Sequence, residues 1–306
     1  MGEQDDLARQ FEARRRWLRA VAYRMLGSLS EADDAVQETW LALSRGDAGQ
    51  IGNLDGWLTT AVSRVCLKTL RTRSARREVP LDWHVPDPIV TGEDGGSPEQ
   101  AALLADDIGL ALLAVLDALA PAERLAFVLH DMFAVPFGQI AVVLARSPAA
   151  ARQLASRARR RVRRAAPVPD PDPARQREVV DAFFAASRAG DIDALIAVLA
   201  PGAVVRSDGG PARPALSAVI RGAADAARGA LGFARLAPFV HPVLVNGSAG
   251  AVAAPNGRPY SVMAFTVTDE KISAIHILAD PDRLRRLDLP RVPQPAFQNT
   301  ATRGSP

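Results

Sequence analysis

The stretch RSPAAARQLASRARRRVRR, residues 146–164, decides how the N-terminal half of this chain is interpreted. Ser147 before Pro148 is a helix start, because serine can accept a backbone N–H bond and proline lacks the N–H that would be unpaired there. Alanines favour the helix that follows, and the whole stretch 146–164 holds eight arginines and no acidic residue. Such a run alone is weak evidence for DNA binding, because a solvated basic surface has the same composition.

The segment before this run strengthens the case for DNA. Its apolar residues recur at helical spacing, namely Phe137, Ile140, Ala141 and Leu144. Only residues 145–147 connect it to the arginine helix. Two helices joined so tightly form a helix-turn-helix, whose second helix enters the major groove with its N-terminal residues. Arg152 and Gln153 can then reach base edges, and the later arginines suit phosphates.

Composition limits the other possibilities. At 306 residues the chain is long enough for two or three domains, and its net charge of +3 conceals a second basic run at 64–77. Two separated basic elements indicate two contacts with nucleic acid. Cys66 is the only cysteine, which excludes internal disulfides and multi-cysteine metal sites, and we expect it in a helical core. Without a signal peptide or a membrane-spanning run, we expect a cytoplasmic protein.

Helical patterns fill the N-terminal part. The first ends at Gly27, and Ser30 with Asp33 predicts a capping box for the next, which turns its acidic side outward. A third helix starts at Asn53 or Asp55. The following segment, rich in Pro, Gly and Asp, is a linker whose apolar residues predict that it docks onto a neighbouring domain.

The C-terminal part changes class. Two helices and a strand at 203–207 lead to an alanine-rich helix at 216–231, and strands follow at 239–245, 250–254, 260–268 and 271–278. Asn-Gly and Asp-Glu pairs between these strands are typical of hairpin turns. We therefore expect an α+β domain in which a curved antiparallel sheet wraps the helices and leaves a pocket. The expected divisions are 1–77, linker 78–98, 99–166, linker 167–173, 174–290 and a disordered tail, 291–306.

Three segments together resemble the extracytoplasmic-function sigma factors of bacterial RNA polymerase. They are YRMLGSLSEADDAVQETWLAL at 23–43, DGWLTTAVSRVCLKTLRTRSARRE at 55–78, and LAPAERLAFVLHDMFAVPFGQIAVVLARSPAAARQLASRARRRV at 119–162. The resemblance implies a multidomain protein with two all-α sigma domains, a helical bundle and the helix-turn-helix. Its partners would be promoter DNA and core RNA polymerase, through the largest-subunit clamp and the flap. The helix around DDAVQE would bind the clamp with Asp34, Val36, Gln37, Glu38 and Trp40.

The resemblance also implies roles in promoter recognition. The melted −10 element would meet Thr59, Thr60, Ser63, Arg64, Lys68, Arg71 and Arg73. A pocket for an extruded base and positive charge along the strand are what such recognition needs. The duplex −35 element would meet Ser147, Ala149, Arg152, Gln153, Ser156, Arg157 and Arg160.

The C-terminal part resembles the SnoaL-like branch of the NTF2 fold, and the fusion points to the SigJ-like group of sigma factors. The resembling segments are VVDAFFAASRAGDIDALIAVLAPGAVVRSDGG at 179–210 and AFTVTDEKISAIHILADPDRL at 264–284. The group's behaviour implies that this extension docks on the sigma domains and linker and modulates activity. The interdomain regulatory residues would be Trp83, His84, Pro86, Asp87, Pro88, Asp208, Gly209, Gly210, Arg213, Asp280, Pro281 and Asp282.

Two other functions stay open at this point. A SnoaL-type enzyme fused to a DNA-binding module would need an acid or base in the cup, and the candidates are Asp208, His241, Tyr260 and His276. Strand alternation could aim His276 inward, but isolated histidines on a sheet are more often structural, so we expect no catalysis, cofactor or metal. A ligand-responsive repressor would need no polymerase-binding helix. A small ligand in the cup fits either a sigma factor or a repressor.

Overall fold

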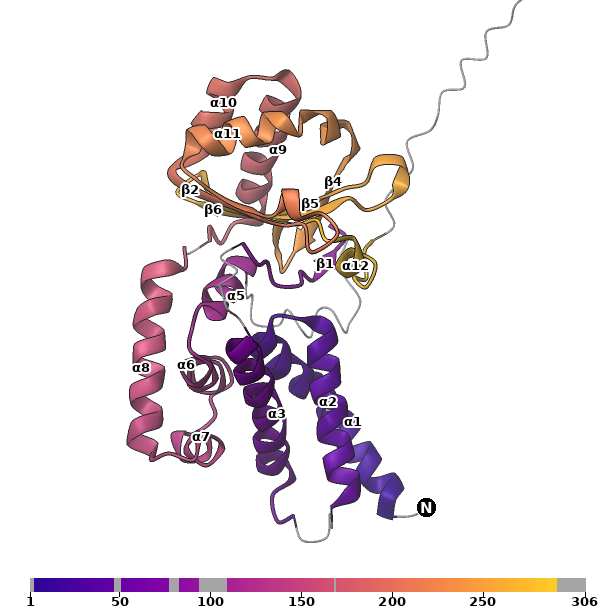
Figure 1. The fold of residues 1–306 in the computed structure, drawn as a ribbon, viewed down its shortest axis with the longest axis vertical. Coiled ribbons are helices and arrows are strands. Elements are labelled where there is room, and N and C mark those ends of the chain that lie inside the picture. Colours follow the sequence, from indigo (N-terminus) through magenta and orange to yellow (C-terminus); the bar gives the residue numbers. More distant parts are fainter. Residues whose placement is uncertain (1–2, 47–50, 77–82, 94–108, 168, 291–306) are drawn as a thin grey trace, which may run out of the picture.

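A computed structural model of the chain describes residues 3–46, 51–76, 83–93, 109–167 and 169–290. The helical part forms the lower half in Figure 1, and the α+β domain stands above it. The tail expected at 291–306 lies outside the described residues, as do 78–82 and 94–98 of the expected first linker.

The first three helices form a bundle, α1 (Glu3–Leu26), α2 (Leu29–Arg45) and α3 (Leu54–Arg76). Gly27 ends α1 with a φ of 70°, a left-handed conformation that glycine adopts without strain. Asn53 caps α3, since its side-chain oxygen accepts a bond from the Gly56 amide at 2.9 Å. Cys66 is fully buried in this bundle as expected, and burial raises the pKa of its thiol to about 12.

The capping box expected for α2 is wrong. The helix begins at Leu29, so Ser30 and Asp33 both lie inside it, and the Ser28 side chain makes no capping bond. The Leu29 amide instead donates to Asp87 Oδ2 at 3.0 Å, a carboxylate that the linker supplies. A distant part of the chain therefore completes the start of this helix.

The second helical unit ends in the expected helix-turn-helix. Its elements are α5 (Leu110–Asp117), α6 (Pro121–Phe127), the π-helical turn η2 (Val128–Met132), α7 (Phe137–Leu144) and α8 (Pro148–Ala165). Ser147 Oγ accepts a bond from the Ala150 amide at 3.2 Å, so the predicted N-cap is confirmed. Ala145 makes the tight connection with a φ of 52°.

The C-terminal domain has the expected α+β architecture. Its helices are α9 (Pro173–Ala189), α10 (Ile192–Val198), α11 (Ala223–Gly232) and α12 (Pro281–Leu284), with 3₁₀ turns η3 (Pro214–Leu216), η4 (Ala234–Phe239) and η5 (Pro255–Gly257). Its strands are β2 (Leu199–Asp208), β3 (Ala218–Arg221), β4 (Val240–Val245), β5 (Ser248–Ala253), β6 (Ser261–Thr268) and β7 (Lys271–Leu278). The linker adds β1 (Val90–Thr91), and the strand order is β1-β4-β5-β6-β7-β2-β3.

Two expectations about this domain are wrong. The sheet is mixed, because β2 pairs in parallel with β7. The helix expected at 216–231 starts only at Ala223, since the preceding residues form β3 beside β2 and Gly222 turns the chain with a φ of 92°. Val219 and Ile220 are β-branched and fit a strand better than a helix.

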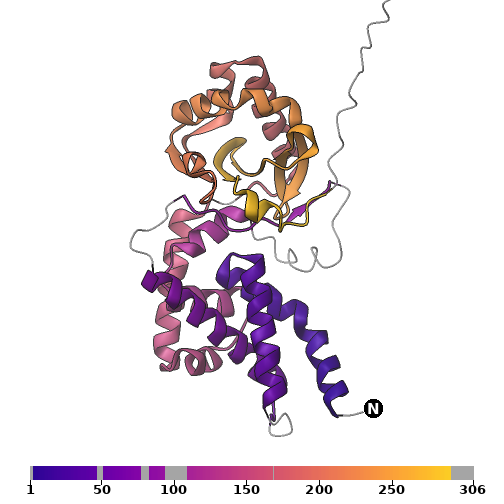
Figure 2. The same ribbon diagram turned by 45° about the vertical axis from the view of Figure 1, so that its right-hand side comes forward.

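The two faces of the curved sheet belong to different cores. One face packs against α9, α10 and α11 around Phe183, Phe184 and Phe265, whose rings lie 5.5–5.6 Å apart. The opposite face joins the core of the helical part through alternate residues such as Val262 and Leu278. In Figure 2 the linker and α12 lie between this face and the helices below. The sheet is thus a wall shared by the cup and the sigma-like part.

Candidate functional site

The predicted polymerase-binding helix presents an acidic surface. Asp34, Gln37 and Glu38 are exposed on α2, whereas Val36 is buried and Trp40 packs on Phe11 with 5.0 Å between ring centroids. Val36 and Trp40 therefore support the helix from the core side, and the polar residues are the ones that another protein could touch.

The residues predicted for −10 recognition differ in exposure along α3. Arg64, Lys68 and Arg71 are exposed, whereas Thr59 and Ser63 are buried and Thr60 is half-buried. Arg73 pairs with Glu31 and donates to the Leu26 carbonyl at 2.9 Å, which fixes it inside the bundle. The exposed cations could follow a nucleic-acid backbone.

The two helical units pack directly on one another. Gln139 Nε2 on α7 donates to the Gly56 carbonyl of α3 at 3.0 Å. Trp17 of α1 meets the edge of Phe133 with centroids 5.5 Å apart, and the Arg24 guanidinium lies over the same ring. The start of α3 is therefore held against the helix-turn-helix.

The predicted −35 surface on α8 stays open. Ser147, Ala149, Arg152, Gln153, Arg157 and Arg160 are exposed and Ser156 is half-buried. The buried carboxylate of Glu123 accepts bonds from Arg157 at 2.9 Å and Arg161 at 3.1 Å. Sequence reasoning missed Glu123, which holds part of the arginine surface against α6.

One guanidinium joins the linker to the C-terminal domain. Arg283 on α12 donates to Asp87 at 2.7 Å, to Asp208 at 2.8 Å and to the Val85 carbonyl at 2.6 Å. His84 Nδ1 lies 3.1 Å from Asp208 Oδ2. We call His84, Asp87, Asp208 and Arg283 the interdomain clasp. It brings together three of the predicted regulatory residues around a cation that the sequence analysis did not select.

Electrostatics favour the charged form of the clasp. Burial raises the pKa of Asp208, but the hydrogen bond from His84 and the charge of Arg283 outweigh it, so the pKa lies below its ordinary value. Asp117, at the end of α5, behaves alike: burial is opposed by the charges of Arg124 and His84, and its pKa is lowered. Arg124 also donates to the Arg24 carbonyl at 3.1 Å, which links the clasp to α1.

The linker is further fixed by Tyr23 and Asn246. The Tyr23 hydroxyl donates to the Asp87 carbonyl at 2.7 Å and accepts from Asn246 Nδ2 at 3.2 Å. The Ile89 amide donates to Asn246 Oδ1 at 3.1 Å, and the Asn246 amide donates to the Ile89 carbonyl at 2.8 Å. Asn246-Gly247 was recognisable as a hairpin turn, but nothing in the sequence indicates that its side chain would hold a segment 157 residues away.

The other predicted regulatory residues surround the clasp unevenly. Gly209 and Gly210 pass so close to the Arg213 carbonyl and the Asp280 carboxylate that a Cβ at either position would clash. Arg213 donates to the Tyr260 and Ala279 carbonyls, both at 3.1 Å. Pro86 and Pro88 are buried and Trp83 is half-buried. Asp280 caps α12, which starts at Pro281, whereas Asp282 pairs with Arg285 at the surface, away from the clasp.

Comparisons with known proteins agree with this geometry. Residues 10–76 match the Sigma-70 region 2 family, and residues 109–162 match Sigma-70, region 4. The chain is 42% identical over 289 residues to the ECF RNA polymerase sigma factor SigJ of Mycobacterium tuberculosis, covering 90% of this chain and 92% of that protein. It belongs to the extracytoplasmic-function sigma factors. As such it directs transcription initiation, binds core RNA polymerase and promoter DNA, and is not an enzyme.

Two further matches support the assignment of this sigma factor. The probable ECF RNA polymerase sigma factor SigI of Mycobacterium tuberculosis is 34% identical over 300 residues, which cover 93% of this chain and 97% of that protein. The crystal structure of Mycobacterium tuberculosis SigJ superposes with a TM-score of 0.74 at 38% identity, covering 92% of this chain and all of that one.

None of the described helices is long and apolar enough to cross a membrane.

The cup does not gather the residues considered for catalysis. Ser207, Ile275 and Ile277 line it, so the alternation of β2 and β7 turns Asp208 and His276 to the opposite face. The inward orientation considered for His276 is therefore wrong. Its ring is buried without a hydrogen-bond partner among the described residues, and burial lowers its pKa to about 3.

Only one of the other two catalytic candidates reaches the cup. His241 follows the lining residue Val240 on β4 and is itself not among the lining residues, whereas Tyr260 is. A single tyrosine gives the cup no second group for acid–base work. The cup is better suited to binding than to chemistry.

Proposed function

We propose that this sigma factor reads two promoter elements and that its own C-terminal domain restrains it in a closed arrangement through the interdomain clasp. It would act in the cytoplasm, where core polymerase is found. The main support is the position of Arg283, which donates to the linker carboxylate of Asp87 and to the C-terminal-domain carboxylate of Asp208 at the same time. The same linker carboxylate caps α2 of region 2. Releasing one cation would thus loosen the C-terminal domain, the linker and region 2 together.

The geometry of a promoter supports this restraint. Elements centred at −10 and −35 lie about 25 base pairs apart, which is about 85 Å at about 3.4 Å per base pair. In the closed arrangement, α3 and α7 contact each other through Gln139 and Gly56. Regions 2 and 4 would therefore have to separate before the proposed −10 residues of α3 and −35 residues of α8 engage one promoter.

The test of initiation is run-off transcription with core polymerase. We expect the double variant Asp34→Ala/Glu38→Ala to lose at least about 90% of promoter-specific transcript, because these exposed carboxylates would face the basic clamp. The matched control, Glu178→Ala/Asp181→Ala, removes two exposed carboxylates from α9. An undiminished amount of transcript from Asp34→Ala/Glu38→Ala would contradict the polymerase-binding role of α2. It would favour the alternative of a ligand-responsive repressor.

The test of restraint uses the same assay. We expect Arg283→Ala to raise transcript severalfold at limiting sigma factor, whereas Arg285→Ala should leave it unchanged, since Arg285 pairs only with its helical neighbour Asp282 among the described residues. Unchanged or reduced output from Arg283→Ala would contradict restraint by the clasp. If the clasp does restrain the sigma factor, a small ligand bound in the cup could regulate that restraint.

A further inference from the structure

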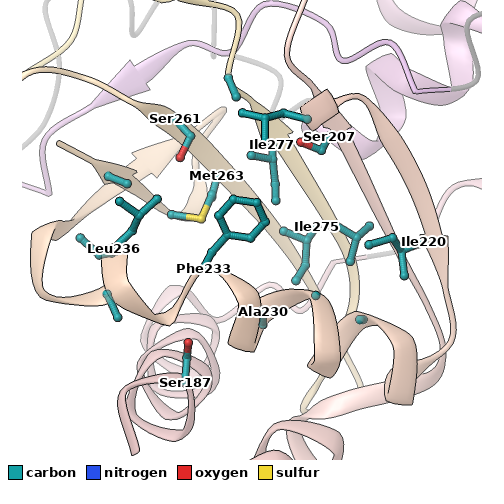
Figure 3. A pocket seen from close by; sticks show the side chains of 18 of the residues that line it. Ser187, Ser207, Ile220, Ala230, Phe233, Leu236, Ser261, Met263, Ile275 and Ile277 are labelled. Carbon is teal, nitrogen blue, oxygen red and sulfur yellow. The ribbon is translucent and has the colours of Figure 1, made fainter. Parts of the chain in front are cut away.

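The C-terminal cup contains a cavity of about 270 Å³. It lies between the sheet and α9 and α11, and Figure 3 shows Phe233, Met263 and Ile275 pointing into it. Its size is near the lower end of small-molecule sites, which are typically about 300–1,000 Å³. Such a cavity has room for one small molecule of one or two rings.

The lining defines the chemistry of that molecule. Aliphatic and aromatic side chains dominate, and none of the described residues that line the wall has a charged side chain. The polar groups on the wall are hydroxyls, those of Ser187, Ser207, Tyr260 and Ser261. A charged ligand would lose its hydration here without gaining a counter-charge, whereas a hydroxyl or carbonyl could bond to a serine.

Phe233 marks the mouth of the cavity. Phe233 is 45% exposed, more than any other aromatic residue that the structure describes, yet its ring points toward the cavity in Figure 3. A bound apolar molecule would cover part of this ring and so gain free energy from the apolar area removed from water.

We infer that the cup binds a neutral, mainly apolar small molecule bearing a hydroxyl or carbonyl oxygen, and that its binding opens the interdomain clasp. This inference rests on the proposed restraint. The connection is covalent at two points. Ser207 lines the cup and precedes the clasp residue Asp208 on β2, where alternation along the strand sends the two side chains to opposite faces. Ala279 lines the cup and precedes Asp280, which caps α12, the helix that carries Arg283.

A third connection runs through Arg213. Its guanidinium lies 4.6 Å from the centroid of Tyr260, a lining residue, and it donates to the Tyr260 and Ala279 carbonyls. Because a molecule of one or two rings would fill this cavity closely, its binding would press this wall outward. Spreading it would shift Asp208 and Asp280, and a clasp already open would resist that shift less.

Coupling of this kind is reciprocal, so it can be measured without transcription. The probe is prodan, a neutral naphthalene ketone whose fluorescence shifts to the blue in apolar sites. We expect Arg283→Ala in the full chain to bind prodan at least fivefold more tightly than the wild type, and Arg285→Ala to bind it equally. Equal or weaker binding by Arg283→Ala would overturn the coupling, whatever its effect on transcription.

The site and ligand class are tested separately. Ala230→Leu should fill the cavity and weaken prodan binding at least tenfold, while Ala224→Leu on the exposed side of α11 should not. If Ala230→Leu lowers the thermal midpoint, Ser187→Leu fills the cavity from α9 instead. The neutral 2-naphthol should displace prodan at tenfold lower concentration than the anionic 2-naphthoate. Equal displacement, or binding unaffected by both filling variants, would overturn the site.

Discussion

Substituting Arg283 by alanine should release the linker while leaving the separate helices intact. The side chains that lose their cation are themselves shielded, with 10% of Asp87 and 3% of Asp208 exposed. Removing one partner of a buried ion pair costs about 3–5 kcal/mol. His84 still contacts Asp208, so we take the lower end, about 3 kcal/mol, which corresponds to an opening equilibrium about 100-fold more favourable.

Hydrogen–deuterium exchange measures this opening directly. Three linker amides donate to groups outside the linker: Val85 to Asp208, Asp87 to the Gly27 carbonyl, and Ile89 to Asn246. When reclosing is fast, the exchange rate of such amides follows the opening equilibrium, so all three should exchange about 100-fold faster in Arg283→Ala.

Two results would contradict a linker held in place by Arg283. One is a change of less than about fivefold at the linker amides, which would mean that other contacts hold the segment. The other is equal acceleration throughout α1 and α9, which would mean general destabilisation. Arg285→Ala is the control, because it removes an arginine of the same segment whose side chain is 73% exposed.

Three further outcomes follow from single residues. Ala145→Gly should raise the free energy of unfolding by about 0.5–1 kcal/mol in urea denaturation, because alanine is strained at a φ of 52°; a decrease would contradict this. His276 stays neutral in the folded chain down to about pH 3, whereas the unfolded chain protonates it below about 6.5. Its stabilising contribution is thus complete above pH 6.5 and is lost as the pH falls, by about 2 kcal/mol at pH 5. His276→Leu should therefore lose correspondingly less stability than the wild type between pH 7 and 5, and equal losses would exclude this origin. Glu123→Gln should free Arg157 and Arg161 and strengthen binding to duplex DNA severalfold in fluorescence anisotropy at low salt; unchanged affinity would show that these arginines do not reach phosphates.

The sequence predicted best what is decided locally. The helix-turn-helix follows from Ser147-Pro148 and from apolar spacing within a few residues, and the structure places both helices as expected. The start of α2 could not be found in this way, since its cap comes from Asp87, 58 residues further along the chain. Local signals describe an element, but they do not reveal a partner supplied by tertiary contact.

The sheet shows the same limit in another form. Alternation along β7 places Ile275 and His276 on opposite faces, but it does not say which face is the cup. Both faces are apolar, because helices cover one and the sigma regions cover the other. Arg283 was missed for a similar reason: an arginine after Asp282 has the sequence pattern of a surface residue, and only the fold brings Asp87 and Asp208 to it.

The exposed arginines of α8 indicate where control of this sigma factor would have to act. Arg152 and Arg160 face solvent in the closed arrangement, so the C-terminal domain does not cover the proposed −35 surface. What the closed arrangement limits is the distance between regions 2 and 4. The linker is the segment that touches region 2 at Leu29, the end of α5 at Asp117 and the sheet at β4. Control of the distance between regions 2 and 4 would therefore act at the clasp. The fused C-terminal domain can exert this control without competing with DNA for the α8 surface.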